Sequence, residues 1–479
     1  MKNKALALTL AFVIAFLLPA GVLAVLDAVT PAQYSGSFLA GLGLKYDLLK
    51  NASSPKIVLI GGSSAAFGVD SDLLEEQLPG YDVVNFGLYA TLGTRLMLDL
   101  SEDYINEGDI VIVAPELDEQ TFSLYFNAQA VWQAAESDPS ILRGIAWDNI
   151  GDMLGGYWKY LAGKITVAKT GAPAPTGVYS LSSIDENGEI SYPREGNTML
   201  LGYDPNMIVG LDGTLLDEEF IGYLNDYAAL CRRKGASCYF SFSPTNRAAL
   251  AEETTAETIL AFYDALDRAL DFEIISDINA CLYDAGYFYD TNFHLGDAGV
   301  TAHTATLIRD IRRILGNAAP VTLEIPEPPG AAVPAASDEP SAEREDMSAF
   351  FLCEDYASGV MITGVTDEGK SEDVLWLPEV SDGKPVIAVA EGALSGCAAS
   401  EIHLSATLVQ LYDGIFASCD NLTAVHMPIT DATRIAVGLD LFRGAPGNVK
   451  LYMSLEAYAS FYNDYSWTRY SDRMAVAGK

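Results

Sequence analysis

The sequence predicts an α/β domain with a central parallel sheet, followed by a smaller domain built from repeats. Short apolar runs alternate with helical segments, beginning with runs at 57–60, 83–86 and 110–113. This order is typical of a parallel sheet with helices on both faces. Beyond a proline-rich stretch, similar segments recur after 22 or 23 residues, a period typical of solenoid repeats.

The elements of the first domain have local signals. The run at 57–60 is apolar and β-branched at three of four positions, as expected of a buried strand. Helices are predicted at 72–77, 94–105, 218–234, 257–270 and 296–315, and further strands at 237–242 and 272–275. Between 117 and 217 the alternation loosens and aromatic residues are frequent, which indicates an insertion over one end of the sheet. Its aromatic side chains either pack together or bind sugar rings, and packing is favoured.

Composition excludes one class of function. The chain has 479 residues, half of them hydrophobic, and a formal net charge of −37. This length is enough for two or three domains with full cores. Binding to phosphates requires clustered lysine and arginine, so nucleic-acid binding is excluded. The acidity also disfavours docking on anionic membranes or polymers.

The N-terminal segment predicts a membrane anchor. Lys2 and Lys4 precede an uncharged run over 5–26, which as a helix would span roughly 33 Å and cross a bilayer. The lysines would keep the N-terminus in the cytoplasm and the bulk of the chain outside it. We therefore expect a single-pass protein of the cell membrane. A signal-peptidase site at 22–24 is the alternative, and it would give a secreted protein.

The predicted organisation has five parts. They are an anchor or signal (1–27), a membrane-proximal segment (28–55), an α/β domain (56–316, with the insertion at 117–217), a linker (317–348) and a repeat domain (349–479). The linker carries six of the 21 prolines and is expected to be extended. The six cysteines lack metal-ligand spacing, so we expect buried thiols, with a Cys231–Cys238 bridge as the alternative. No metal or other cofactor is expected.

A serine and a histidine stand at one edge of the predicted sheet. Ser63 follows two glycines at the carboxyl end of the first strand, where open α/β sheets bind ligands. A serine nucleophile needs a base, and before the linker only His294 and His303 are available. His303 falls within a helix and is expected to be structural, whereas His294 lies in a loop at the sheet edge. Asp290 could hold the imidazole of His294 if the loop is tight.

This constellation resembles the SGNH (GDSL-like) hydrolases. In that family a serine follows strand one, a glycine follows strand two, an asparagine follows strand three, and an Asp-x-x-His motif precedes the last helix. Residues 61–63, 85–87 and 289–299 match the first, second and fourth elements. The resemblance covers about 56–315 apart from 116–217, and it is closest to a membrane-anchored, extracytoplasmic branch of acyl-transfer proteins. It implies a flavodoxin-like three-layer sandwich in which Ser63, His294 and Asp290 are catalytic.

The acidic residue departs from the family pattern. Asp290 stands four residues before His294 rather than three, and Thr291 occupies the usual acid position. Two alternatives follow: Asp290 still reaches the ring, or Asn292 orients the ring instead.

The residues expected to bind the oxyanion also depart from the family pattern. Pro115 and Glu116 stand where the asparagine of the family is expected. A carboxylate there opposes the negative charge that develops in the transition state, so Glu116 either points away or has another role. The resemblance leaves the backbone N–H groups of Ser63 and Gly87 as oxyanion donors.

The second domain resembles BspA-type leucine-rich repeats. The resemblance is carried by residues 387–397 and 413–427, which share a Gly-x-Φ-x-x-Cys segment. Only two clear units are visible, so flanking arms at 350–385 and 448–476 are expected to cap a short stack. The resemblance implies adhesion or protein binding at a bacterial surface.

Two histidines recur within these repeats. His403 and His426 occupy equivalent positions, 23 residues apart. A metal pair is one interpretation of the spacing, but solvent-facing repeat positions are favoured.

Two functions follow as expectations. The first is a cell-surface serine esterase or O-acyltransferase acting on an acylated glycan or cell-envelope polymer. The alternative is a catalytically silent adhesion or protein-binding protein that uses its repeats. The Ser63, Asp290 and His294 set favours the enzyme, whereas the missing third-strand asparagine favours the silent protein. We also expect the repeats to be separate from the chemistry at Ser63.

Overall fold

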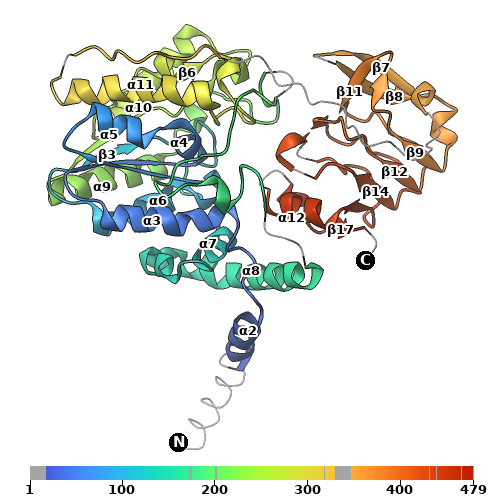
Figure 1. The fold of residues 1–479 in the computed structure, drawn as a ribbon, viewed down its shortest axis with the longest axis horizontal. Coiled ribbons are helices and arrows are strands. Elements are labelled where there is room, and N and C mark those ends of the chain that lie inside the picture. The colour runs from blue at the N-terminus through green and yellow to red at the C-terminus, as the bar shows by residue number, and fades with distance from the viewer. Residues whose placement is uncertain are drawn as a thin grey trace, which may run out of the picture.

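The computed structural model divides into two halves that lie side by side (Figure 1). It describes residues 18–171, 175–199, 202–317, 319–328, 347–357, 359–430, 432–438, 440–464 and 467–477. We call the described residues up to 328 the α/β half and those from 347 the repeat half. Each half has its own apolar core, and no side chain belongs to both cores.

A four-stranded parallel sheet forms the centre of the α/β half, with the order β2-β1-β3-β4. Its strands are β1 (Lys56–Gly61), β2 (Asp82–Gly87), β3 (Ile110–Val113) and β4 (Ser237–Phe240). The predicted α/β class and its parallel sheet are confirmed. The strand predicted at 272–275 shrinks to one parallel bridge between Phe240 and Ile274, and a small separate pair joins β5 (Thr245–Asn246) to β6 (Leu282–Tyr283).

Helices cover both faces of this sheet because its strands are apolar on both sides (Figure 1). Ile57 and Leu59 of β1 face one cluster, which includes side chains of α5 and α11. Val58 and Ile60 face the larger cluster, which includes side chains of α3, α6 and α9. The helices of this half are α3 (Gly41–Asn51), α4 (Ser63–Gly68), α5 (Ser71–Gln77), α6 (Thr94–Ser101), α7 (Ala128–Ala135), α8 (Ile150–Thr170), α9 (Glu218–Lys234), α10 (Ala256–Ala269) and α11 (Asp297–Ile314).

Caps explain why several predicted helices begin where they do. The Asp70 side chain accepts a hydrogen bond from the N–H of Leu73 at the start of α5, and Asp217 does the same for Phe220 in α9. Gly235, with a φ of 81°, ends α9 in the left-handed conformation. The difference from expectation lies at 63–68, where a short helix, α4, replaces the predicted turn.

The insertion packs largely against itself and the N-terminal segment. Trp132 of α7 stacks on Tyr160 of α8, with ring centroids 6.2 Å apart. Lys164 of α8 forms ion pairs with Asp27 at 2.6 Å and Glu136 at 3.2 Å. Trp132, Tyr157 and Tyr160 therefore pack together, the interpretation that the sequence favours, whereas Trp147 and Trp158 are 89% and 61% exposed.

Two parallel sheets run through the repeat half. One has the order β17-β16-β14-β12-β9, and the other has the order β15-β13-β11-β8-β7, with β7 antiparallel at its edge and β10 beside β11. The first comprises β9 (Val374–Trp376), β12 (Glu401–His403), β14 (Ala424–Met427), β16 (Lys450–Met453) and β17 (Met474–Val476). The second comprises β7 (Phe351–Tyr356), β8 (Gly359–Val365), β11 (Lys384–Val389), β13 (Gln410–Leu411) and β15 (Ala436–Val437); β10 is Val380–Ser381 and the helix α12 is Leu455–Asn463. The arms around the two visible units thus add strands to the stack.

The predicted membrane anchor requires correction. Within the described residues, no helix is long and apolar enough to cross a membrane. The first described helix, α2 (Leu18–Val29), has 12 residues, or about 18 Å of helix. The finding contradicts membrane attachment through an N-terminal helix and the single-pass location inferred from it. The first 17 residues of the predicted segment lie outside the described part.

All six cysteines are unbridged, and five of them are buried. The thiol interpretation therefore describes Cys231 and Cys238 better than the bridge does. Most of the predicted linker, 329–346, lies outside the described residues.

Candidate active site

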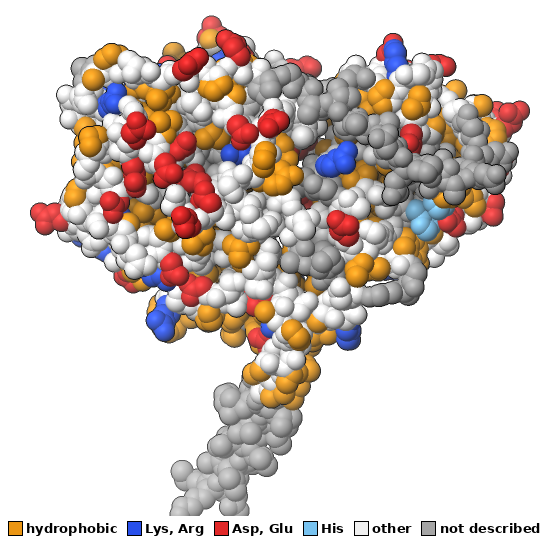
Figure 2. Space-filling view, viewed as in Figure 1, with side chains coloured by type: hydrophobic (Ala, Val, Ile, Leu, Met, Phe, Trp, Pro, Cys, Tyr) orange, Lys and Arg blue, Asp and Glu red, His pale blue; other side chains and the backbone are white. Residues whose placement is uncertain are grey.

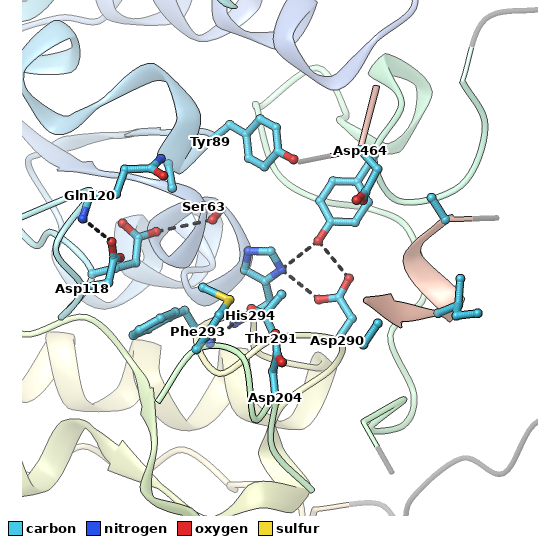
Figure 3. Close-up of a pocket in the computed structure, with 17 residues that line it drawn as sticks. Ser63, Tyr89, Asp118, Gln120, Asp204, Asp290, Thr291, Phe293, His294 and Asp464 are labelled. Carbon is cyan, nitrogen blue, oxygen red and sulfur yellow. Dashed lines mark hydrogen bonds and ion pairs between the residues drawn. The ribbon is translucent and has the colours of Figure 1, made fainter. Parts of the chain in front are cut away.

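A cavity of about 110 Å³ lies where the two halves meet (Figure 3). It contains Ser63, His294, Asp290 and Glu116, four of the six residues that the sequence selects. The repeat half contributes part of the wall, which contradicts the expectation that the repeats are separate from Ser63. The lining residues are Ser63, Tyr89, Ala90, Glu116, Asp118, Gln120, Tyr179, Asp204, Met207, Asp290, Thr291, Phe293, His294, Ala432, Ile435, Ala436 and Asp464.

Ser63 is the first residue of α4, directly after β1, and its side chain is 5% exposed. A Cβ at Gly62 would lie 2.3 Å from Glu116 Oε2, so only glycine permits this approach of the carboxylate. The chain therefore uses the second glycine of the turn to bring Glu116 beside the serine.

Glu116 binds the N-terminal turn of α4. Its Oε1 accepts a hydrogen bond from the backbone N–H of Ser64 at 2.7 Å and a longer one from Ser63 Oγ at 3.4 Å. The residue is 1% exposed, and its Oε2 has no hydrogen-bond partner among the described residues. Glu116 thus points toward the serine rather than away from it.

The loop before α11 presents a histidine–carboxylate pair. His294 Nδ1 lies 2.8 Å from Asp290 Oδ1. Thr291 Oγ1 accepts hydrogen bonds from the N–H groups of Phe293 and His294, and the Tyr289 N–H donates to the His294 carbonyl at 2.8 Å. These bonds fold the loop tightly, so that an acid four residues before the histidine reaches its ring.

Tyr179, from the insertion, completes this pair. Its hydroxyl donates to Asp290 Oδ2 at 2.9 Å and lies 3.0 Å from His294 Nδ1 (Figure 3). Burial, with a further contribution from Asp290, raises the pKa of Tyr179 well above its usual value, which keeps the hydroxyl a donor. Phe67 of α4 stacks on the imidazole, with centroids 4.1 Å apart and planes 10° apart. The ring of His294 is therefore held by Asp290 and Tyr179 at Nδ1 and by Phe67 against one face.

Ser63 and His294 face the same cavity without a direct bond. The Nδ1–H of His294 donates to Asp290, which leaves Nε2 as the acceptor, and this side of the ring is turned toward Ser63 (Figure 3). In the described residues, the Ser63 hydroxyl bonds to Glu116 and not to His294. A serine–histidine pair would require the Ser63 hydroxyl to leave Glu116, and catalytic hydrogen bonds are often long before substrate binds.

Gly87 and Asn292 do not line the cavity. The Gly87 N–H donates to Asn85 Oδ1 at 3.2 Å, and a Cβ there would lie 2.4 Å from that of Ala65. The Asn292 amide binds the backbone of Asp204 and Met207 at 2.8–2.9 Å. In this geometry Gly87 permits close packing of α4 on β2, and Asn292 holds a neighbouring loop.

His303, the other histidine of this half, lies within α11. It is buried beside the Tyr283 hydroxyl at 3.2 Å, and burial lowers its pKa to about 3. It stays neutral and is outside the cavity lining.

The cavity also holds acidic residues that the sequence does not single out. Burial and the nearby Glu116 raise the pKa of Asp118 to about 6, against hydrogen bonds from Thr121 and Gln120 that lower it. Burial also raises the pKa of Asp204. No sequence signal selects these residues, Tyr179 or Asp464, because they lie far along the chain from Ser63.

Comparisons with known proteins add little. No protein-family model matches the sequence, and the search of curated proteins found no match. Among solved structures, the crystal structure of a T. pallidum leucine-rich repeat protein is similar to part of the chain, with 21% sequence identity and a TM-score of 0.17. The match covers 23% of this chain and 65% of that one, so it spans less than two thirds of that protein. A likeness this weak carries no argument about the fold.

Proposed function

We propose that the chain is a serine esterase or O-acyltransferase of the SGNH type, with a leucine-rich-repeat half that helps to enclose its active site. The observation that carries the proposal is the Asp290–His294 pair, which lies in one cavity with Ser63 at the carboxyl end of β1. A carboxylate–imidazole pair beside a serine is the arrangement needed to activate a hydroxyl nucleophile.

Each residue then has a defined role. The Ser63 hydroxyl turns from Glu116 to His294 Nε2, and its oxygen attacks the acyl carbon as the proton moves to the imidazole. Asp290 stabilises the imidazolium through the 2.8 Å contact at Nδ1. The imidazolium then protonates the leaving alcohol, which leaves an acyl-serine. Water, or the hydroxyl of an acceptor, takes the acyl group in the second step and regenerates Ser63.

Glu116 sets a condition on this chemistry. An ionised carboxylate beside the Ser64 N–H competes with the oxyanion for that donor. The Ser63 N–H remains a candidate oxyanion donor, and transition-state stabilisation improves when the Glu116 carboxylate moves away from the Ser64 N–H. The proposed reaction therefore depends on where the Glu116 side chain lies when substrate is bound.

The residues that line the cavity restrict the class of substrate that it can bind. Carboxylates and tyrosines are frequent in it, and none of its described residues is lysine or arginine. An anionic acyl group would meet uncompensated negative charge, so a neutral or cationic acyl ester is favoured. The nearby rings of Tyr89 and Tyr179 suit an acylated sugar, which supports an acylated glycan or other polymer as substrate.

A second candidate function is a catalytically silent binding protein. The contact of Glu116 with the Ser64 N–H favours it, because this contact occupies a donor that the enzyme would use. In that case the repeat half carries the function and Ser63 is structural.

Covalent labelling separates the two candidates. An active Ser63 should react with a fluorophosphonate probe, and Ser63→Ala should abolish both labelling and hydrolysis of small acyl esters. His294→Gln should lower kcat at least 10³-fold, on the order found for triads. Ser64→Ala is the matched control, since the neighbouring Ser64 does not line the cavity. Labelling that persists in Ser63→Ala, or an intact protein that does not react, would reject the enzyme.

A further inference from the structure

A ladder of rings crosses the first sheet of the repeat half. The strand register places His403 of β12 between Trp376 of β9 and His426 of β14, and Tyr452 of β16 follows. His403 stacks on Trp376 with centroids 3.3 Å apart, and on His426 with centroids 4.2 Å apart. The repeat therefore holds two imidazoles face to face on neighbouring strands.

A carboxylate joins both imidazoles at the same edge. Glu401 Oε1 lies 2.7 Å from His403 Nε2 and 2.9 Å from His426 Nε2. The three ligand atoms all lie within 4.8 Å of one another. The side chains of Glu401, His403 and His426 are 38%, 15% and 32% exposed, so an ion from solvent can reach them. Figure 2 shows histidine side chains at the surface of this half.

We propose that Glu401, His403 and His426 form a binding site for a transition-metal dication of the Zn²⁺ class. Two imidazole nitrogens and one carboxylate oxygen are a donor set that such ions prefer, with the remaining positions open to water. Ca²⁺ and Mg²⁺ select oxygen ligands and do not fit two imidazoles. This site is separate from the Ser63 cavity and does not depend on the function proposed for it.

The ion requires only a small adjustment of the side chains. At about 2.0–2.1 Å from each donor, a tetrahedral ion holds its ligands about 3.3 Å apart. The contacts between Glu401 and the two rings are 2.7 and 2.9 Å, so they must open by a few tenths of an ångström. The parallel rings must also tilt so that both Nε2 lone pairs point at one ion, with the proton of each ring on Nδ1.

Such a site would fasten two adjacent repeats. Glu401 and His403 come from β12, and His426 comes from β14. An ion bound to all three stabilises the folded repeats, because binding to the native state alone shifts the folding equilibrium. The open positions also allow a ligand from a partner to reach the same ion.

Titration of the full-length protein tests the proposal. After chelator treatment, ZnCl₂ is added in a buffer containing millimolar Mg²⁺, which competes for weak sites on this acidic chain. We expect one Zn²⁺ per chain by calorimetry, and a rise in the melting temperature of the repeat half. His403→Gln and His426→Gln should each weaken the association at least tenfold. Glu391→Gln is the matched control, because this carboxylate of the same half is 67% exposed and pairs with Arg443; it should bind Zn²⁺ like wild type.

Spectroscopy on the unmutated protein provides a second measurement that does not depend on the folding of variants. X-ray absorption of the Zn²⁺ complex should show two imidazole ligands. Cu²⁺ should quench the fluorescence of Trp376, which stacks on His403, and the quenched fraction should disappear in Trp376→Phe. Absence of stoichiometric binding, an ion without imidazole ligands, or an affinity equal to that of wild type in either histidine variant would overturn the proposal.

Discussion

The two halves of the molecule build parallel sheets in different ways. In the α/β half, helices cover both faces of the sheet, and apolar side chains point to both faces. In the repeat half, short strands follow one another at a nearly constant interval and stack in two ladders. The first design leaves side chains at the carboxyl ends of different strands to converge, whereas the second places equivalent side chains in a row.

This difference is visible in the histidines. His294 reaches its partner Asp290 through a tightly folded loop and is fixed by Phe67 and Tyr179 from distant segments. His403 and His426 meet only because their strands are neighbours in a repeat. Convergence therefore creates a buried site from unlike segments, and repetition creates an exposed site from like ones.

Because the two halves have separate cores, we expect them to unfold separately. The largest expected effect is therefore on the free energy of unfolding of one half. Ile402→Ala in β12 removes a fully buried side chain of the repeat core and should cost about 2–5 kcal/mol. Calorimetry should show two transitions, of which only that of the repeat half moves. Ile112→Ala in β3, equally buried in the other half, is the matched variant and should move the other transition. A single transition that both substitutions shift would show that the halves unfold together.

The second-largest expected effect comes from buried carboxyl groups, whose pKa values differ between the two halves. Among the described residues, every carboxyl with a raised pKa belongs to the α/β half, and Asp118 is raised from 3.8 to about 6. Between these values the folded protein binds more protons than the unfolded one, so the contribution of Asp118 to stability falls as the pH rises from about 4 to about 6. Asp118→Asn should therefore gain stability relative to wild type by on the order of 2 kcal/mol over this range.

Chemical unfolding of wild type and Asp118→Asn at pH 4.5 and 7 measures this difference. The comparison between the two proteins cancels the opposing effect of His303, whose pKa is lowered to about 3. A stability difference that is the same at both pH values would contradict the prediction. The transition of the repeat half should be unaffected by the substitution.

The smallest effect that we expect is that of a repeat-half residue on catalysis in the cavity that contains Ser63. Ala436 in β15 lines the cavity from the repeat half, so Ala436→Leu should narrow it. For a long acyl ester we expect kcat/KM to fall about tenfold, in the range that one or more methylenes change in an apolar pocket, while an acetyl ester is little affected. Ala424→Leu is the control, because Ala424 lies in β14 of the other ladder, outside the cavity. Equal loss in both variants would mean that the wall does not contact substrate.

Much of this architecture is predictable because its signals are local. The strand at 57–60 and the helix at 218–234 follow from apolar periodicity and caps, and the repeat follows from self-similarity. The strand predicted at 272–275 forms only one bridge, at Ile274, since local propensity does not specify pairing. The short helix at Ser63 also escapes prediction, because glycines and serines favour a turn locally.

The candidate site was predictable in part for the same reason. Ser63, Asp290 and His294 stand at recognisable positions relative to predicted strands and helices. The position of Tyr179 depends on how the insertion folds back, and that of Asp464 on how the halves meet. Such long-range contacts carry no periodicity in the sequence, so only the folded chain shows that these residues share a cavity.

The shared cavity wall has a consequence for how strongly the halves must attract one another. Because both halves belong to one chain, their meeting is intramolecular, and the effective concentration of tethered partners can be on the order of millimolar. An interface of only modest intrinsic affinity then stays closed for most of the time. If the proposed polymer is the substrate, a brief opening of such an interface would let it enter from the side, without threading its end.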